Sequence, residues 1–215
     1  MKVAIAGASG LTGSHTLQLL LEHPQVKQVI AIGRSPLQLM HPRLQQVLLQ
    51  QQKLTTPVSA DAFICCLGTT IRKAGSKPAF EAIDRQLPVH LATQLQQQGC
   101  RTAAVVSAMG ASSNSLFFYN RVKGLMEDDL QQAGFHSLHI LRPSIIDGDR
   151  QEHRKMEKWA LKFARATRPL MIGPMKTYRS IHAATIAKGL LYCITHPEPG
   201  IHVYPSLQIE EIAAL

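Results

Sequence analysis

The sequence is poor in aromatic residues, and its few cysteines follow no pairing pattern. Phe, Trp and Tyr make up only 5% of the 215 residues, so no stacking platform for single-stranded nucleic acid is expected. The four cysteines, at positions 65, 66, 100 and 193, contain no CxxC spacing. Their pattern therefore predicts neither a zinc site nor a disulfide framework. Free thiols are typical of a reducing compartment, and we expect a cytoplasmic protein.

Long apolar runs and metal-binding motifs are also missing. No apolar run reaches the roughly 18–20 residues that a membrane-spanning helix requires, and the sequence begins with a predicted strand rather than a targeting peptide. We therefore expect no membrane association. The ten histidines include no HExxH motif and no close cluster with carboxylates, so we expect no metal site.

Acidic residues are in the minority. The chain has 23 Lys and Arg against 14 Asp and Glu, which gives a formal net charge of +9 and favours anionic partners. The basic residues are scattered, so nucleic-acid binding is not expected. A small-molecule substrate is favoured, and in one interpretation this substrate is anionic. One local basic cluster falls on a predicted helix at 152–166. The oligomeric state cannot be derived from the sequence.

Predicted strands and helices alternate along the chain. The expected strands are Lys2–Ala6, Val26–Ile32, Leu44–Leu49, Asp61–Leu67, Thr102–Ser107, Ser137–Leu141 and Ile201–Tyr204. The expected helices are Leu11–Glu22, a short one at 36–40, Phe80–Gln98, Tyr119–Gln132, 152–166, Ala183–His196 and Leu207–Leu215. This alternation predicts an α/β protein with a doubly wound parallel sheet, the three-layer α/β/α Rossmann fold. We expect one domain over residues 1–215, with a small substrate-side region or lid at 144–182.

Three evenly spaced glycines follow the first predicted strand and open the first predicted helix. In dinucleotide-binding folds, one such glycine permits a tight turn, one lets the backbone approach the pyrophosphate, and one allows the helix to pack on the strand. The helix N-terminus then offers free N–H groups to the phosphates. The loop lacks Gly-Lys-Ser/Thr, which argues against a P-loop nucleoside triphosphatase. The predicted cofactor-binding residues of this loop are Gly7, Ser9, Gly10, Leu11, Thr12 and Gly13.

The end of the second predicted strand indicates which dinucleotide is bound. Folds that bind NAD place an acidic residue about 20 positions after the glycines, where it holds the ribose 2′-hydroxyl. Here no carboxylate occurs between Glu22 and Asp61, and Arg34 and Ser35 stand at the expected place. A guanidinium pairs with a 2′-phosphate that a carboxylate would repel. We therefore predict NADP(H) as the cofactor, with Arg43 as a weaker second candidate for the phosphate contact.

A serine, a tyrosine and a lysine follow at positions that suit proton transfer. Ser107 ends a predicted strand, and Tyr119 and Lys123 share one helix face because they are four residues apart. Tyrosine has an ordinary pKa of about 10, and a neighbouring ammonium favours its ionised form. Such a tyrosine can exchange a proton with a carbonyl or hydroxyl oxygen that the serine holds. These three residues are the predicted catalytic set.

Together, these motifs resemble the short-chain dehydrogenase/reductase superfamily. The glycine spacing is similar to its extended and atypical branches. Closer similarity is found to small atypical members akin to the Tat-interacting oxidoreductases and the NmrA-like group, often labelled nucleoside-diphosphate-sugar epimerase-like. The stretches that carry this similarity are Gly7-Ala-Ser-Gly-Leu-Thr-Gly, Gly33-Arg-Ser, Cys65-Cys-Leu-Gly-Thr-Thr, Phe118-Tyr-Asn-Arg-Val-Lys-Gly, Leu141-Arg-Pro-Ser and Tyr178-Arg-Ser-Ile-His.

The resemblance implies further cofactor contacts and a choice of functions. It places Leu67, Gly68 and Thr69 beside the cofactor ribose and pyrophosphate, makes Lys123 a ribose anchor, and sets three more residues beside the nicotinamide. Those three residues are Arg142, Pro143 and Ser144. The favoured function is an NADPH-dependent reductase of a small carbonyl compound with Tyr119 as proton donor. Two alternatives remain: an NADPH-binding redox sensor or scaffold without significant turnover, and an epimerase-like enzyme.

Overall fold

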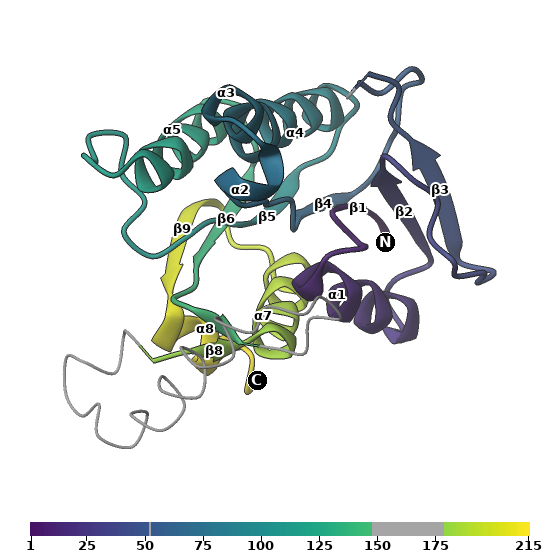
Figure 1. Cartoon of the computed structure of the whole chain (residues 1–215). Helices are drawn as coiled ribbons and strands as arrows, with labels where there is room; N and C mark the ends of the chain where they lie inside the picture. The colour runs from purple at the N-terminus through teal and green to yellow at the C-terminus, as the bar shows by residue number, and fades with distance from the viewer. Residues whose placement is uncertain (52, 148–178) are drawn as a thin grey trace.

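A seven-stranded sheet forms the centre of the molecule (Figure 1). The computed structural model describes residues 1–51, 53–147 and 179–215. All neighbouring strands pair in parallel, in the order β3-β2-β1-β4-β5-β6-β9. The strands are β1 (Lys2–Ala6), β2 (Gln28–Gly33), β3 (Leu44–Leu48), β4 (Ala62–Cys65), β5 (Thr102–Val106), β6 (Ser137–Arg142) and β9 (Gly200–Pro205). The chain reverses its direction of winding between β1 and β4, where folds of this type bind dinucleotides at the carboxyl ends of the strands.

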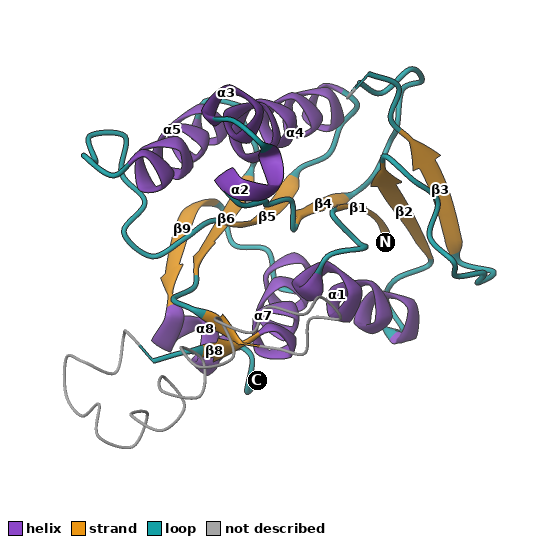
Figure 2. Ribbon diagram, viewed as in Figure 1, coloured by secondary structure: helices purple, strands orange, loops and turns teal. Residues whose placement is uncertain are grey.

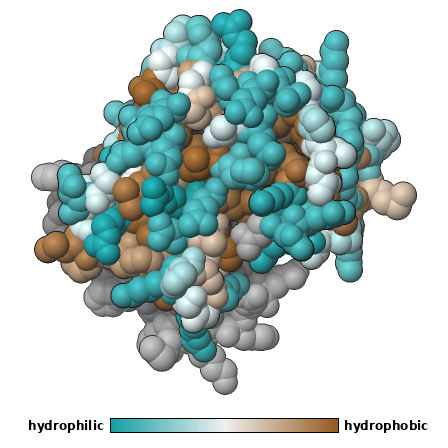
Figure 3. Space-filling view, turned by 90° about the horizontal axis from the view of Figure 1, so that it is seen from above, coloured by the Kyte–Doolittle hydropathy of each residue, from teal (hydrophilic) through white to brown (hydrophobic). Residues whose placement is uncertain are grey.

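Helices cover both faces of this sheet, which confirms the predicted three-layer Rossmann architecture (Figure 2). One face carries α1 (Leu11–Glu22), α7 (Ala183–Thr195) and α8 (Ser206–Ile212), and the other carries α4 (Leu87–Gln97) and α5 (Phe118–Gln131). Seen from the side of α3 to α5, the surface is mainly hydrophilic with small hydrophobic areas (Figure 3). Among the described residues, no helix is long and apolar enough to span a membrane.

The inner strands consist almost entirely of buried apolar residues because both of their faces are covered. Every residue of β4 and β5 is buried. Val3 and Ile5 of β1 pack towards α1 and α7, whereas Phe63 of β4 and Leu138 of β6 pack towards α4 and α5. The sheet is thereby fixed between two separate apolar layers, and its carboxyl edge forms a rigid base for the loops that leave it.

The helical segment before β5 differs from its prediction in a way that affects the site. It begins before Phe80, with α3 (Lys77–Glu81), and it contains a π-helical turn, η1 (Ala82–Gln86), before α4. Leu87 N–H donates to the carbonyl of Ala82, five residues earlier. Pro88 has no N–H to donate, so the wider turn accommodates the proline without interrupting the helix. The turn places Asp84 inside the protein.

Three other local predictions were wrong or lie outside the described residues. The short helix at 36–40 does not form, and the side-chain amide of Gln46 binds the backbone of Leu37 and Leu39 instead. The short helix α2 (Ile71–Ala74) and the two-residue strands β7 (Ile146–Asp147) and β8 (Ile181–His182) were not predicted. The basic helix at 152–166 and most of the 144–182 region lie outside the described residues.

Candidate functional site

The glycine loop is packed so closely that side chains cannot be added at two of its positions. Gly7 has φ = 83°, a left-handed conformation that favours glycine, and a Cβ there would lie 2.7 Å from the Cys66 carbonyl. A Cβ on Gly13 would lie 2.0 Å from the carbonyl oxygen of Gly7. Gly10 N–H donates to that same oxygen at 2.9 Å. Only glycine fits at positions 7 and 13, because the backbones of the strand, the turn and the helix are in contact there.

The N-terminus of α1 is open to a ligand. Gly10 occupies the cap position in an extended conformation, and within the described residues no side-chain cap binds the start of the helix. Ser9 is exposed beside it, whereas Thr12 is buried. Unpaired N–H groups and the positive end of the helix dipole suit a phosphate group, so the predicted loop residues fit a pyrophosphate.

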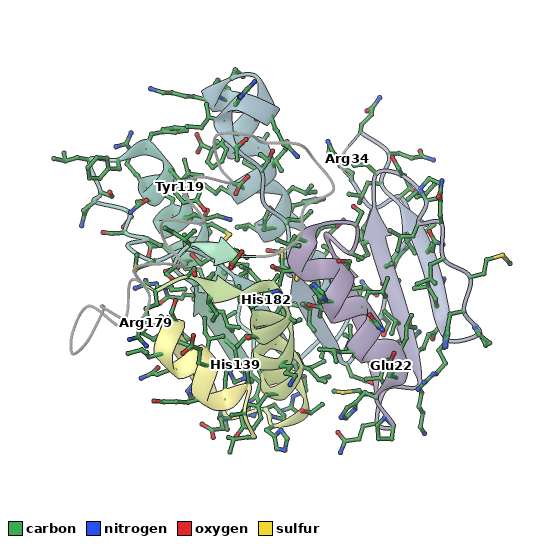
Figure 4. All side chains as sticks on the ribbon, turned by 60° about the horizontal axis from the view of Figure 1, so that its bottom comes forward. Glu22, Arg34, Tyr119, His139, Arg179 and His182 are labelled. Carbon is green, nitrogen blue, oxygen red and sulfur yellow. The ribbon has the colours of Figure 1, made fainter. Side chains whose placement is uncertain are left out.

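Arg34 and Arg43 have different roles at the edge of this site. Arg34 and Ser35 directly follow β2 and are exposed. Figure 4 shows Arg34 and Tyr119 far apart, with the N-terminal end of α1 between them. Arg43, in contrast, donates to the backbone carbonyls of Leu21, His23 and Val26. Its guanidinium therefore stabilises the C-terminal end of α1, which corrects the suggestion that it binds a ribose phosphate.

The segment after β4 connects the glycine loop with the predicted catalytic residues. On one side, the backbone of Cys66 and Leu67 lies against Gly7. On the other, a Cβ built on Gly68 would lie 3.6 Å from Asp84 Oδ1 and 4.0 Å from Lys123 Nζ. The residues from Cys66 to Gly68 thus contact the glycine loop on one side and Asp84 and Lys123 on the other, at the point where the winding of the sheet reverses.

Asp84 is a site residue that the sequence analysis missed. Its Oδ1 lies 2.9 Å from Lys123 Nζ, and the two side chains are 1% and 3% exposed. Its Oδ2 accepts from the N–H of Thr69 at 2.9 Å. A signal for it was available: Asp84 shares the spacing of the buried apolar residues Phe80, Leu87 and Leu91, and a carboxylate on a buried helix face requires a partner.

Tyr119 and Lys123 lie one turn apart on α5, as predicted. The Tyr119 ring is 5.7 Å from the ring of Phe80, and 39% of the residue is exposed. Burial raises the pKa of Tyr119; Lys123 opposes this increase and Asp84 adds to it. Burial alone would lower the pKa of Lys123, but Asp84 reverses the shift and raises it. Lys123 therefore carries its charge inside the protein at neutral pH.

Ser107 follows β5 and has a buried hydroxyl without a hydrogen-bond partner among the described residues. The residue is 4% exposed, and its N–H donates to the carbonyl of Leu141 at 2.7 Å. Buried hydroxyl groups are nearly always hydrogen-bonded in proteins. A ligand oxygen would provide the missing partner, and this fits the predicted role of Ser107 at a carbonyl group.

The polar groups of Arg142 and Ser144 are already engaged within the protein. Arg142 forms an ion pair with the buried carboxylate of Glu127, with Nη2 2.5 Å from Oε2. Ser144 N–H donates to the hydroxyl of Ser206 at 2.7 Å, and its own hydroxyl donates to the Arg179 carbonyl. Pro143 is buried and its carbonyl accepts from Met109 N–H. Their expected contacts with a cofactor stay predictions.

No group of three His, Cys, Asp or Glu side chains that could hold a metal ion is found in the described ranges. All four cysteines are free thiols, and burial raises the pKa of Cys65 to about 11 and that of Cys193 to about 12. These thiols are therefore neutral, as expected of small core residues.

Several solved structures share this fold. MoeE5 in complex with UDP-glucose and NAD aligns with a TM-score of 0.70 at 16% identity, covering 100% of this chain and 81% of that one. Human epimerase family protein SDR39U1 with NADPH aligns with a TM-score of 0.58 at 16% identity, covering 95% and 74%. At this level of identity the similarity shows the fold and no more.

Comparison with known sequences identifies closer relatives. "Protein fmp52, mitochondrial" of Aspergillus clavatus is 35% identical over 173 residues, covering 72% of this chain and 70% of the relative. "Protein HTATIP2" of Rattus norvegicus is 35% identical over 168 residues, covering 75% and 69%. The predicted resemblance to small atypical short-chain dehydrogenase/reductase proteins is confirmed. The expected cytoplasmic location is contradicted, because the fungal relatives are named mitochondrial proteins.

The profile of the family described as HIM1 matches residues 25–171. This match begins after the glycine loop and includes the segment from Ser107 to Lys123. It extends over more than half of the sequence and agrees with the curated relatives. The chain therefore belongs to the HIM1 family.

Proposed function

We propose that this protein is an NADPH-dependent reductase of small carbonyl compounds. One observation carries the proposal: a buried, charged Lys123 lies one helical turn from Tyr119 and borders the same short segment that packs against the glycine loop. A dinucleotide that binds across the β1/β4 reversal point would place its phosphates at one end of this segment and its reactive ring at the other.

Each part of the cofactor is assigned to its own group of residues. The loop from Gly7 to Gly13 and the N-terminus of α1 would bind the pyrophosphate. Arg34 would pair with the 2′-phosphate, aided by Ser35, because no carboxylate stands at the end of β2 to repel it. Gly68 and Thr69 would contact the nicotinamide-side ribose. Solved structures of this fold were determined in complex with NAD or NADPH, which supports the choice of ligand class.

When bound, the reduced nicotinamide would supply hydride to the carbonyl carbon. Ser107 would donate a hydrogen bond from its unpartnered hydroxyl to the carbonyl oxygen and orient it. Tyr119 would transfer its phenolic proton to that oxygen as charge develops there. Lys123 would stabilise the tyrosinate that remains, and water would return the proton. We also propose that the 144–182 region encloses the substrate and that this substrate is anionic.

The test is turnover in a panel of aldehydes, ketones and quinones, followed as NADPH oxidation, with the wild type and Tyr119→Phe. The variant is expected to lose about 100-fold or more in kcat/KM, the range that general acid catalysis contributes, and to keep its affinity for NADPH. Tyr192→Phe, which removes a hydroxyl on α7, is the matched control and is expected to behave as the wild type.

Three outcomes would contradict the proposal. Full turnover by Tyr119→Phe would exclude the tyrosine as proton donor. NADPH binding without turnover on any carbonyl compound would instead favour a cofactor-binding sensor, and binding of a UDP-sugar with retained NAD would favour an epimerase-like enzyme.

A further inference from the structure

Asp84 makes two contacts that place it between the two halves of the site. One carboxylate oxygen pairs with Lys123 Nζ at 2.9 Å, and the other accepts from Thr69 N–H at 2.9 Å. The π-helical turn Ala82–Gln86 is what directs this residue into the protein. A single side chain therefore links the segment that follows β4 to the lysine on α5.

The charged surroundings of Lys123 are simple in the part of the chain that the structure describes. Asp84 faces it from the π-helical turn, Tyr119 from its own helix, and the Cys65 thiol from β4. The Cys65 thiol stays neutral because burial raises its pKa to about 11. Asp84 and Lys123 thus form a pair of opposite charges one helical turn from Tyr119.

We infer that Asp84 is a positioning residue that counters the charge of Lys123, keeps the proton on Tyr119, and so extends carbonyl reduction to higher pH. This inference rests on the proposed function, because it concerns the proton donor of that reaction. It goes beyond the Ser107, Tyr119 and Lys123 set by naming the group that decides the protonation state of the tyrosine.

Asp84 acts on Tyr119 through its charge. A lone ammonium beside a phenol favours the phenolate, which acts as a base and accepts a proton from an alcohol. A carboxylate 2.9 Å from that ammonium opposes its effect on the tyrosine. Tyr119 then enters the reaction as a phenol: its O–H bond breaks, a new O–H bond forms on the substrate oxygen, and water returns a proton to the tyrosinate. Burial is the largest cause of the raised pKa of Tyr119, and Asp84 adds to it against the opposing effect of Lys123.

The test is a titration of Tyr119 by carbon-13 NMR of protein with labelled tyrosine, with the resonance assigned by Tyr119→Phe. The decisive variant is Asp84→Asn, because its amide oxygen still accepts from Thr69 N–H while the charge is gone. We expect Tyr119 and Lys123 together to release their first proton at a pH lower by about one unit or more. An unchanged titration would overturn the inference.

Two further variants keep the test decisive. Asp129→Asn removes a carboxylate of α5 that pairs with Arg85. This variant is expected to leave the titration of Tyr119 unchanged. If Asp84→Asn does not fold, the double variant Asp84→Asn/Lys123→Met removes both buried charges. We expect its tyrosine to titrate within about half a unit of the wild type, because the field at the hydroxyl is again close to neutral. A larger shift would contradict the inference.

The titration requires neither cofactor nor substrate, so it separates this inference from the proposed function. A lowered titration in Asp84→Asn without any carbonyl reductase activity would refute the function and leave the role of Asp84 in place. With a substrate in hand, the rate of carbonyl reduction by Asp84→Asn is further expected to decline about one pH unit below the pH at which the wild-type rate declines. An unshifted pH profile would refute this role of Asp84.

Discussion

The carboxylate of Asp84 lies 2.9 Å from the ammonium of Lys123, in a place where neither side chain is more than 3% exposed. A pair of charges withdrawn from water is stable only while both members are present. The pair joins the π-helical turn to α5, and it lies beside Gly68 in the segment after β4 that also packs against the glycine loop.

Breaking this pair from one side should destabilise the protein more than removing it completely. Asp84→Asn and Lys123→Met are each expected to lower the free energy of unfolding by about 3–5 kcal/mol, because each leaves one buried charge uncompensated. The double variant should lose less than either single one. Urea unfolding followed by circular dichroism measures all three, and additive losses would show that the two charges are not coupled.

Gly13→Ala tests whether the glycine loop is as crowded as its geometry indicates. The new Cβ would lie 2.0 Å from the Gly7 carbonyl oxygen, so the loop must shift. We expect NADPH affinity to fall at least tenfold and stability to fall by about 1–3 kcal/mol, the usual cost of overpacking. Gly33→Ala, whose Cβ would find its nearest neighbour at 3.6 Å, serves as the stability control. Unchanged NADPH binding by Gly13→Ala would refute the loop assignment.

His139 should make the protein sensitive to mild acid. Burial, assisted by the nearby His202, lowers the pKa of His139 to about 4. The unfolded chain, with a histidine pKa near 6.5, binds a proton that the folded protein refuses, so stability falls as the pH decreases from about 6.5 towards 4. Between pH 7 and 4.5, His139→Gln is expected to lose about 2 kcal/mol less stability than the wild type.

A comparison of unfolding curves at the two pH values checks this prediction. His196→Gln, at the exposed end of α7, is the control and is expected to keep the acid sensitivity of the wild type. Equal losses in the wild type and His139→Gln would show that another group causes the acid sensitivity.

The sheet and its order of elements were predictable because buried parallel strands have a distinctive composition. Ala62–Cys65 and Thr102–Val106 are continuous apolar runs that suit only a covered sheet, and α1 has the bounds that its spacing and Pro24 predicted. The glycine loop was predictable because three glycines at fixed spacing between a strand and a helix indicate close backbone contacts.

The contacts that complete the site were not predictable from spacing alone. Asp84 lies 39 residues before Lys123, and only the tertiary fold and the π-helical turn bring them together. Arg43 had the right charge and a suitable position to bind a phosphate, but its guanidinium meets three carbonyl groups at the end of α1. Similarly, no local pattern in the sequence pairs Arg142 with Glu127.

The proposed function requires that the glycine loop and Arg34 together bind NADPH. Calorimetric titration of the wild type and Arg34→Ala with NADPH and with NADH tests it most directly. We expect the wild type to bind NADPH at least tenfold more tightly than NADH, and Arg34→Ala to lose this preference because only its affinity for NADPH decreases. Failure of the wild type to bind either dinucleotide, or a preference for NADH, would contradict it.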